Sequence, residues 1–546
     1  MWCNGIIAQG GDVKRSFGAS LWRCGAVLTL ATVLSGLATG ASASPWVEVG
    51  NSQLRSDIEL LAEAGVIDNI TTQWPLPWGG ILARLNSPSA LYNQPGYIDA
   101  AAERVRQVGE AQTQTDRLRV SISSDFTNNP DVVRGFDAMG RAQAQGQVSA
   151  EYLWSSTAVR INVGVQSAST NPAFRYPTGI QPTYDSNGYG GPYYPNIIPD
   201  HQVLVLDGSY IAQRVGNAVV YAGYLSHWWG PGWVSADLLS NNARPMPQVG
   251  ISRISTTPFK WPVLSWLGPW QAEVFFGLLD GPRLNRNTIY DGTRITFSPL
   301  PGLEIGVSRT QLMCGANHPC NPLKSYFNVT NSTTHLDQAN SEGQYDVRYT
   351  SNVWHVPFEI YAETMFTNAS VPQPINATHL VGSSVWLPIA GHRVRFTLEY
   401  DNTIPTYTLF GFSTVTPGWT YNSPKYFDGL RYRGRALGSS LDTDSEMESL
   451  QVSWTGAHSQ TYTLTYHHVG IGKFKDTGPL AGTNHSEPLW GNAVTTAPVH
   501  FNLVEARVSF PWRNWTFDLE ARAQDDQPRP YHGFTGAVEL ATHYSF

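Results

Sequence analysis

The sequence is poor in charge and, after its first forty residues, in long apolar runs. Asp, Glu, Lys and Arg make up 14% of the 546 residues, against about a quarter in an ordinary soluble domain. Beyond Ser44 no run reaches the ~20 apolar residues that a membrane-spanning helix needs. The formal net charge of −7 excludes nucleic acid as an expected partner. A β-barrel or a secreted soluble fold remains.

Catalytic and metal-binding signatures are missing as well. The chain has no Gly-x-Ser-x-Gly elbow, no His-Glu-x-x-His, no phosphate-binding loop and no Cys-x-x-Cys. The pair His467 and His468 would suit a barrel esterase, but strand histidines more commonly face a lumen or an interface. We therefore expect no enzymatic activity, no cofactor and no metal. Asp442 and Asp444 leave open whether a loop binds calcium.

Cysteine is scarce, with four in the whole chain. Cys3 and Cys24 lie in the leader described below. Cys314 and Cys320 bracket a Gly-Ala-Asn-His-Pro segment, and in an oxidising compartment this spacing predicts a small disulfide loop. His318 between them is a weak argument for a metal site.

The first 43 residues have the pattern of a secretory signal. Lys14, Arg15 and Arg23 precede an apolar stretch at 25–37, and Ala-Ser-Ala at 41–43 gives the small-x-small motif of a cleavage site. We expect residues 1–43 to be a cleaved signal peptide, which makes this an exported protein.

Residues 44–114 differ from the rest of the chain because their apolar residues have helical spacing. Helices are predicted over about 52–65, with Ser52 as a cap and Gly65 as a stop, and over about 80–85 and 97–112. Three short helices can bury one small core. We expect a small helical bundle ahead of the following domain.

From 115 to 546 the apolar period becomes two, which places alternate residues on opposite faces of a strand. Polar residues alternate with apolar ones at 159–166, 393–400, 504–510, 517–522 and 534–546, and in several of these strands they include charges of both signs. Such charges would be costly in a sandwich core, but they stay hydrated in an aqueous lumen. The pattern and the 12% aromatic content predict an all-β transmembrane outer-membrane barrel. Its length suggests about 16 to 20 antiparallel strands at roughly 20 to 25 residues each.

Two segments have the residue types that recognise sugars. One is 227–233 (His-Trp-Trp-Gly-Pro-Gly-Trp) with 241–245, and the other is 431–435. Indoles stack on pyranose rings, amides bond to hydroxyls, and arginine grips carboxylates. Without a binding role, the first would be an interfacial aromatic belt and the second a lumen salt-bridge ladder that holds a loop. The candidate polysaccharide-binding residues are Trp229, Trp233, Asn241, Asn242, Arg244, Tyr421, Arg431, Tyr432 and Arg433.

Several blocks resemble the Wzi-like capsule-assembly family of outer-membrane proteins. They begin with 44–50 (Ser-Pro-Trp-Val-Glu-Val-Gly), 54–62 and 65–76. They continue with 228–232 (Trp-Trp-Gly-Pro-Gly), 240–245 (Ser-Asn-Asn-Ala-Arg-Pro) and 432–445. The resemblance implies an 18-stranded barrel with a helical bundle at the periplasmic mouth. It also implies outer loops that act as a lectin for capsular polysaccharide. The Cys314–Cys320 loop and the Tyr- and Pro-rich stretch at 167–200 match no block of the family.

The leading hypothesis is therefore a non-enzymatic lectin of the bacterial outer membrane that anchors capsular or extracellular polysaccharide. The alternative is an outer-membrane diffusion porin, which the same alternation would serve. A further hypothesis treats residues 44–112 as a module that binds peptidoglycan. The expected partners are polysaccharide and outer-membrane lipid, with peptidoglycan or the barrel-assembly machinery in addition.

Overall fold

The structure is a computed structural model. It describes residues 45–546 except the segments 168–203, 328–338, 368–376, 407–417 and 473–491 and the shorter gaps at 69, 88–90, 93, 282, 284, 317, 319, 354–355, 390–391, 424–425, 427, 457–458 and 496. The proposed signal peptide and most of the 167–200 stretch lie outside the described residues.

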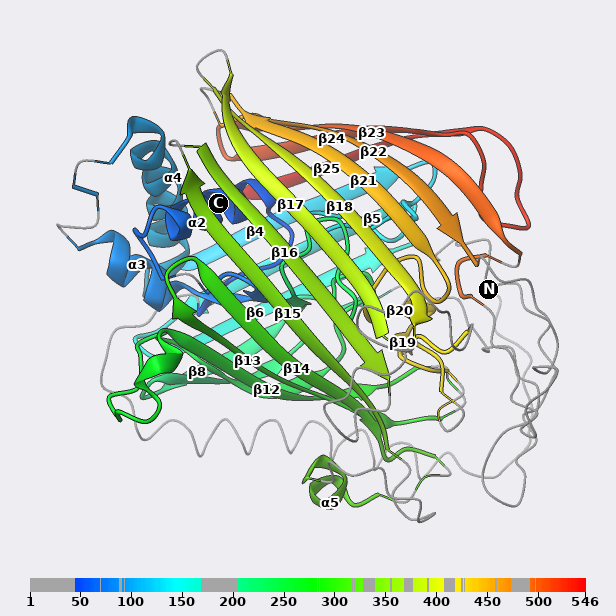
Figure 1. The fold of residues 1–546 in the computed structure, drawn as a ribbon, viewed down its shortest axis with the longest axis horizontal. Coiled ribbons are helices and arrows are strands. Elements are labelled where there is room, and N and C mark those ends of the chain that lie inside the picture. The colour runs from blue at the N-terminus through cyan, green and yellow to red at the C-terminus, as the bar shows by residue number, and fades with distance from the viewer. Residues whose placement is uncertain are drawn as a thin grey trace, which may run out of the picture.

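The main body is a closed barrel in which every neighbouring pair of strands is antiparallel (Figure 1). The barrel contains 19 labelled strands. The short strand β7 and the longer β8 both pair with β6, so together they form one interrupted strand. This leaves 18 strand positions, and the predicted barrel of about 18 strands is confirmed. β25 closes the barrel against β4.

The barrel strands run in chain order around the wall. They are β4 (Leu118–Thr127), β5 (Ala144–Leu153), β6 (Thr157–Gln166), β7 (Leu204–Val205), β8 (Tyr210–Val215), β9 (Ala218–Gly223), β11 (Gln248–Arg253), β12 (Trp270–Leu279), β13 (Thr288–Leu300), β14 (Leu303–Met313), β15 (Asn340–Val353), β16 (Val356–Thr367), β17 (Ala377–Ile389), β18 (His392–Thr406), β21 (Glu446–Thr455), β22 (Thr461–Ile471), β23 (Val499–Trp512), β24 (Trp515–Gln524) and β25 (Thr535–Ser545).

The two faces of the strands differ as the period of two predicts. On the outer wall Ile161 and Leu398 are 59% and 57% exposed, whereas their neighbours Asn162 and Thr397 are buried. In the last strand Val538 is exposed and Glu539 is buried. An apolar outer wall around a polar interior suits a barrel with lipid outside.

The two ends of the barrel also differ. At the end near the helices most turns are short, as at 301–302 and 513–514. The longer exception is 254–269, which includes the 3-10 helix η2 (Ser265–Leu267) and exposes Trp261 and Trp266. Connections at the other end are longer. Among the described helices, none has the length and apolarity to cross a membrane.

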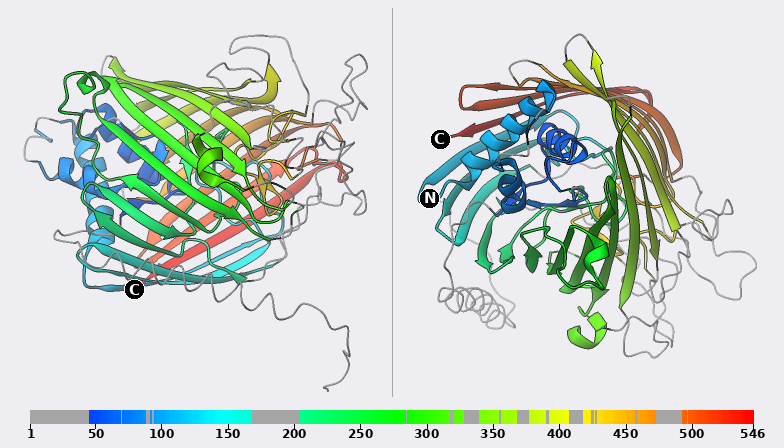
Figure 2. Two further views of the ribbon diagram at one scale, coloured as in Figure 1. Left: turned by 90° about the horizontal axis from the view of Figure 1, so that it is seen from below. Right: turned by 60° about the vertical axis from the view of Figure 1, so that its left-hand side comes forward.

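The N-terminal residues form α2 (Ser52–Glu63), α3 (Trp78–Leu85) and α4 (Gly96–Thr113), together with β1 (Trp46–Val47), β2 (Gln73–Trp74) and β3 (Leu76–Pro77). The three predicted helices are confirmed, but the cap of α2 is Asn51 and not Ser52. The Asn51 side chain accepts a hydrogen bond from the Leu54 amide at 2.9 Å. The helices sit in one mouth of the barrel (Figure 2).

The apolar core of the helical segment continues into the barrel. Phe136, Trp228 and Trp386 come from the barrel domain and belong to the same buried cluster as Ile58 and Leu61 of α2. The N-terminal residues are therefore packed into the barrel and do not form a separate domain beside it.

Candidate functional site

Much of the lumen is occupied by three segments of the chain, which we call the plug: residues 45–86 from the helical end, and residues 224–247 and 418–445 from the loop end. Residues of the β4–β5 connection, such as Phe136, pack against this plug. The first two segments of the plug meet as a short antiparallel ladder. β10 (Trp228–Trp229) pairs with β2, so that Trp228 faces Trp74 and Trp229 faces Gln73. The Gly230 amide adds a hydrogen bond to the Thr72 carbonyl at 2.9 Å.

Arg55 of α2 fixes the next turn of this ladder. Its guanidinium donates to the carbonyls of Pro231 and Gly232 at 2.7 and 2.8 Å and lies 4.1 Å from the centre of the Trp233 ring. Its Nε pairs with Glu59 at 2.8 Å. Sequence reasoning missed Arg55 as a functional residue. The sequence feature that could have indicated its burial is a charged residue next to the apolar helix positions 54 and 58.

Carboxylates of the barrel wall hold the backbone of residues 224–247. Glu399 of β18 accepts hydrogen bonds from the amides of Trp233, Val234 and Ser235 at 2.7–3.1 Å. Glu363 of β16 accepts one from the Gly232 amide at 2.9 Å. Buried backbone amides need such partners. The lumen charges that identify the barrel in the sequence thus serve to anchor the plug.

Residues 418–445 complete the plug and include the small hairpin of β19 (Arg431–Tyr432) and β20 (Arg435–Ala436). The Ser240 amide donates to the Leu437 carbonyl at 2.8 Å. The Asn242 side chain donates to the Ala436 carbonyl at 2.9 Å. The Tyr421 hydroxyl donates to the Asp237 carbonyl. The two segments that the sequence suggested for sugar recognition are therefore brought together by the fold.

Eight of the nine candidate binding residues are buried in this plug. Asn241 donates to the Phe136 carbonyl at 2.9 Å, Arg244 pairs with Asp207 at 2.7 Å, and Tyr432 donates to Asp280. Trp229, Trp233, Asn242, Tyr421 and Arg431 are also buried. Arg433 is the most open of the nine, with its side chain 13% exposed and 3.1 Å from Asp280. The eight thus have structural partners, and their role in sugar contact stays a prediction.

Burial shifts the protonation of several plug residues. It lowers the pKa of His227 to about 4, and this neutral ring stacks on Phe275 with centroids 4.7 Å apart. Burial raises the pKa of Asp444 to about 7. Both carboxylate oxygens of Asp442 accept from Arg431. Asp442 therefore serves an ion pair, which does not favour the calcium loop left open by the sequence.

A second charged region lies on the lumen wall of β23 and β24. Asp131, Glu505 and Glu520 bring carboxylate oxygens within 4.8 Å of one another. Arg522 pairs with Glu520 at 2.5 Å, and Arg507 pairs with Asp518 at 3.1 Å. These arginines compensate part of the negative charge.

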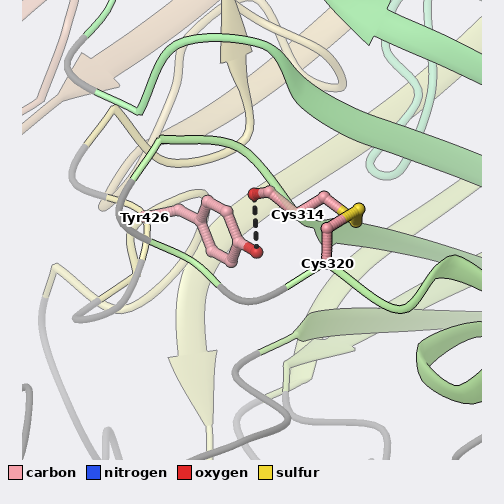
Figure 3. The surroundings of a disulfide bond; sticks show 3 residues. All are labelled: Cys314, Cys320 and Tyr426. Carbon is pink, nitrogen blue, oxygen red and sulfur yellow. Dashed lines mark hydrogen bonds between the residues drawn. A yellow bond between two sulfur atoms is a disulfide. The ribbon is translucent and has the colours of Figure 1, made fainter.

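The structure joins Cys314 and Cys320 in a disulfide at the loop end (Figure 3). The Tyr426 hydroxyl donates to the Cys314 carbonyl at 3.2 Å, and the Tyr426 ring stacks on His318 at 4.3 Å. The disulfide loop therefore contacts residues 418–445 of the plug.

A closed antiparallel barrel with an apolar outer wall, filled by its own chain, defines a plugged outer-membrane β-barrel. The family model described as capsule assembly protein Wzi matches residues 112–528. The chain belongs to this family.

A solved structure of another protein has the same fold. The Escherichia coli outer-membrane protein Wzi, described as a carbohydrate-binding β-barrel involved in group 1 capsule assembly, superposes with a TM-score of 0.71. It is 17% identical, and the match covers 91% of this chain and 98% of that one. An uncharacterized 55.8 kDa protein from the cps region of Klebsiella pneumoniae is 26% identical over 288 residues. That match covers 53% of this chain and about half (50%) of the relative. Pseudomonas aeruginosa OprD, with a TM-score of 0.40, 8% identity and coverage of 79% and 94%, is too distant to support an argument.

Proposed function

We propose that this protein holds capsular or other extracellular polysaccharide at the surface of the bacterial outer membrane, as a binding protein without catalytic activity. The family to which the chain belongs supports this role. So does the fold shared with E. coli Wzi, whose description names carbohydrate binding. Removal of residues 1–43 as a signal peptide is part of the proposal.

The observation that carries the proposal is the filled lumen. Residues 45–86 enter from one end and residues 224–247 and 418–445 from the other, and they meet through hydrogen bonds and buried rings. A diffusion porin needs a continuous water path. The plug argues against that alternative and favours a rigid platform for the outer loops.

The binding surface in this proposal is the loop end of the barrel. The hairpin that carries Arg433 lies beside Asp280, at the β12–β13 connection of that end. We assign direct contact with acidic or hydroxyl groups of the polymer to Arg433. The eight buried candidates would position the loops. Many such weak contacts along one polymer can retain it by avidity.

The decisive experiment measures the ratio of cell-bound to shed high-molecular-weight polysaccharide with and without this gene. Unchanged total polymer with more in the shed fraction after deletion supports anchoring. An unchanged ratio with an unchanged total would reject it. Complementation with the wild-type gene must restore the bound fraction.

Binding to peptidoglycan through residues 44–112 and contact with the barrel-assembly machinery stay predictions. The helices pack into the barrel mouth, so a test of cell-wall binding should use the full chain and purified sacculi. Co-sedimentation of the full chain with sacculi would support the first of these partners.

A further inference from the structure

The segment that begins at the disulfide runs from the lumen side of the barrel to the outside of its wall. The described residues 314–316, 318 and 320–327, which we call the strap, begin at Cys314 and end with the short helix α5 (Pro322–Phe327), which lies outside the barrel wall (Figure 1). Neither the polysaccharide-binding role nor the plug accounts for this arrangement.

The strap is bonded to polar residues on the outer wall. Arg309 of β14 donates to the Tyr326 carbonyl at 2.8 Å, and Gln311 donates to the Ser325 carbonyl at 3.1 Å. The Tyr326 hydroxyl lies 2.9 Å from the Thr293 hydroxyl of β13. Arg309, Gln311 and Thr293 alternate with lumen-facing residues, so they stand on the outer face.

A carboxyl group is buried on that same face. Asp291 is the cross-strand partner of Gln311, has 0% exposure, and neither of its carboxylate oxygens has a hydrogen-bond partner. Elsewhere on the outer wall, polar residues such as Glu448 and His468 are left exposed. The burial of Asp291 is therefore particular to this part of the outer wall.

The outward side of the strap is apolar. Leu323 and Phe327 are 73% and 71% exposed, and a spacing of four places them on one side of the helix. Tyr326 packs its ring on Phe276 of the outer wall, with centroids 5.4 Å apart. The exposed wall residues Val307 and Ile295 follow on the same two strands. The apolar side of the strap is thus continuous with the lipid-facing band.

We propose that the strap is a lipid anchor: the disulfide holds α5 against the outer wall, and Leu323 and Phe327 insert into the boundary of the outer leaflet. Helices that lie in a membrane interface bury Trp, Phe and Leu side chains at the boundary between headgroups and acyl chains. This inference rests on the proposed outer-membrane orientation but not on polysaccharide binding.

The test places a fluorophore at Phe327→Cys in the full mature chain, with the native disulfide intact, reconstituted in phosphatidylcholine vesicles. One quencher is a lipid spin-labelled near its headgroup and the other is aqueous iodide. Val347→Cys on the outer wall is the lipid-facing control, and His532→Cys in an exposed loop is the water-facing control. We expect the lipid quencher to act several-fold more strongly at 327 than at 532.

Three outcomes would overturn the proposal. Position 327 could behave like position 532, or two labels at 327 could quench each other, which would indicate a second copy of the chain. In the third outcome, the label at 327 would stay lipid-quenched in the Cys314→Ser, Cys320→Ser variant. The disulfide would then not be what holds α5 at the membrane. If Val347→Cys also fails to contact lipid, the membrane orientation itself is wrong, and polysaccharide retention still has to be judged separately.

Discussion

Arg431 and Asp442 are joined by two hydrogen bonds in the interior of the plug, from Nε to Oδ2 at 2.6 Å and from Nη2 to Oδ1 at 2.5 Å. Both side chains are almost fully buried. Two residues further on, Arg433 is partly open and pairs with Asp280 at the edge of the plug. Arg431 and Arg433 belong to one motif but have different surroundings. We therefore expect a structural role for Arg431 and a binding role for Arg433.

Replacing Arg431 with Ala should destabilise the protein by about 3–5 kcal/mol, because it leaves the Asp442 carboxylate buried without its partner. Denaturant unfolding in detergent measures this change. Arg433→Ala is the matched control and should unfold close to the wild type while lowering the cell-bound polysaccharide fraction. If Arg431→Ala and Arg433→Ala had the same free energy of unfolding, a structural role for Arg431 alone would be contradicted.

The wild-type protein should show no large steady conductance steps in planar bilayers. Gly223 and Gln248 are direct cross-strand partners, so a short Gly-Ser turn can replace residues 225–246 without breaking the barrel. This deletion should produce steps, because it removes β10 and the backbone that Glu399 binds. Large steps from the intact protein would instead return the porin hypothesis to first place.

Gly230→Ala should loosen the plug. Gly230 has a φ of +132°, and an added Cβ would lie 2.2 Å from Glu363 Oε1, so both backbone strain and a clash oppose the side chain. We expect a loss of about 1–3 kcal/mol in the free energy of unfolding. Gly146→Ala is the control, since nothing lies within 4 Å of its Cβ position. If the two variants unfold alike, the close approach at Gly230 is not structurally important.

Stability should fall as the pH rises from about 4.5 to 8, in part because of Glu63. Burial in the barrel mouth raises the pKa of this carboxyl from 4.5 to about 8, and neither oxygen has a hydrogen-bond partner. Between pH 4.5 and 8 the folded protein keeps a proton on Glu63 that the unfolded chain has released. The contribution of this proton to the free energy of unfolding is therefore complete below pH 4.5 and is lost as the pH rises through 8. Glu63→Gln should make the denaturant midpoint of unfolding less dependent on pH over this range. Glu110→Gln, on the exposed face of α4, should leave that pH dependence unchanged.

Local pattern was sufficient for much of the fold. The alternation at 159–166 identified which residues face lipid, because a strand places successive side chains on opposite faces whatever surrounds it. The spacing of Leu54, Ile58 and Leu61 identified α2 for the same local reason. The cap was missed by one residue, since Asn51 and Ser52 are both good caps and only the backbone conformation distinguishes them.

The sequence by itself determined the barrel, the three helices and the polar character of the lumen, because each follows from a short period along the chain. Tertiary structure alone decided that Trp229, Trp233 and Arg431 fill the lumen. Their partners are remote in sequence: Arg55 and Gly232, for example, are 177 residues apart. No local period encodes such a pairing, and an indole suited to stack on a sugar is equally suited to pack in a core. Closure of the barrel brings those distant residues within bonding distance and so determines which role each side chain takes.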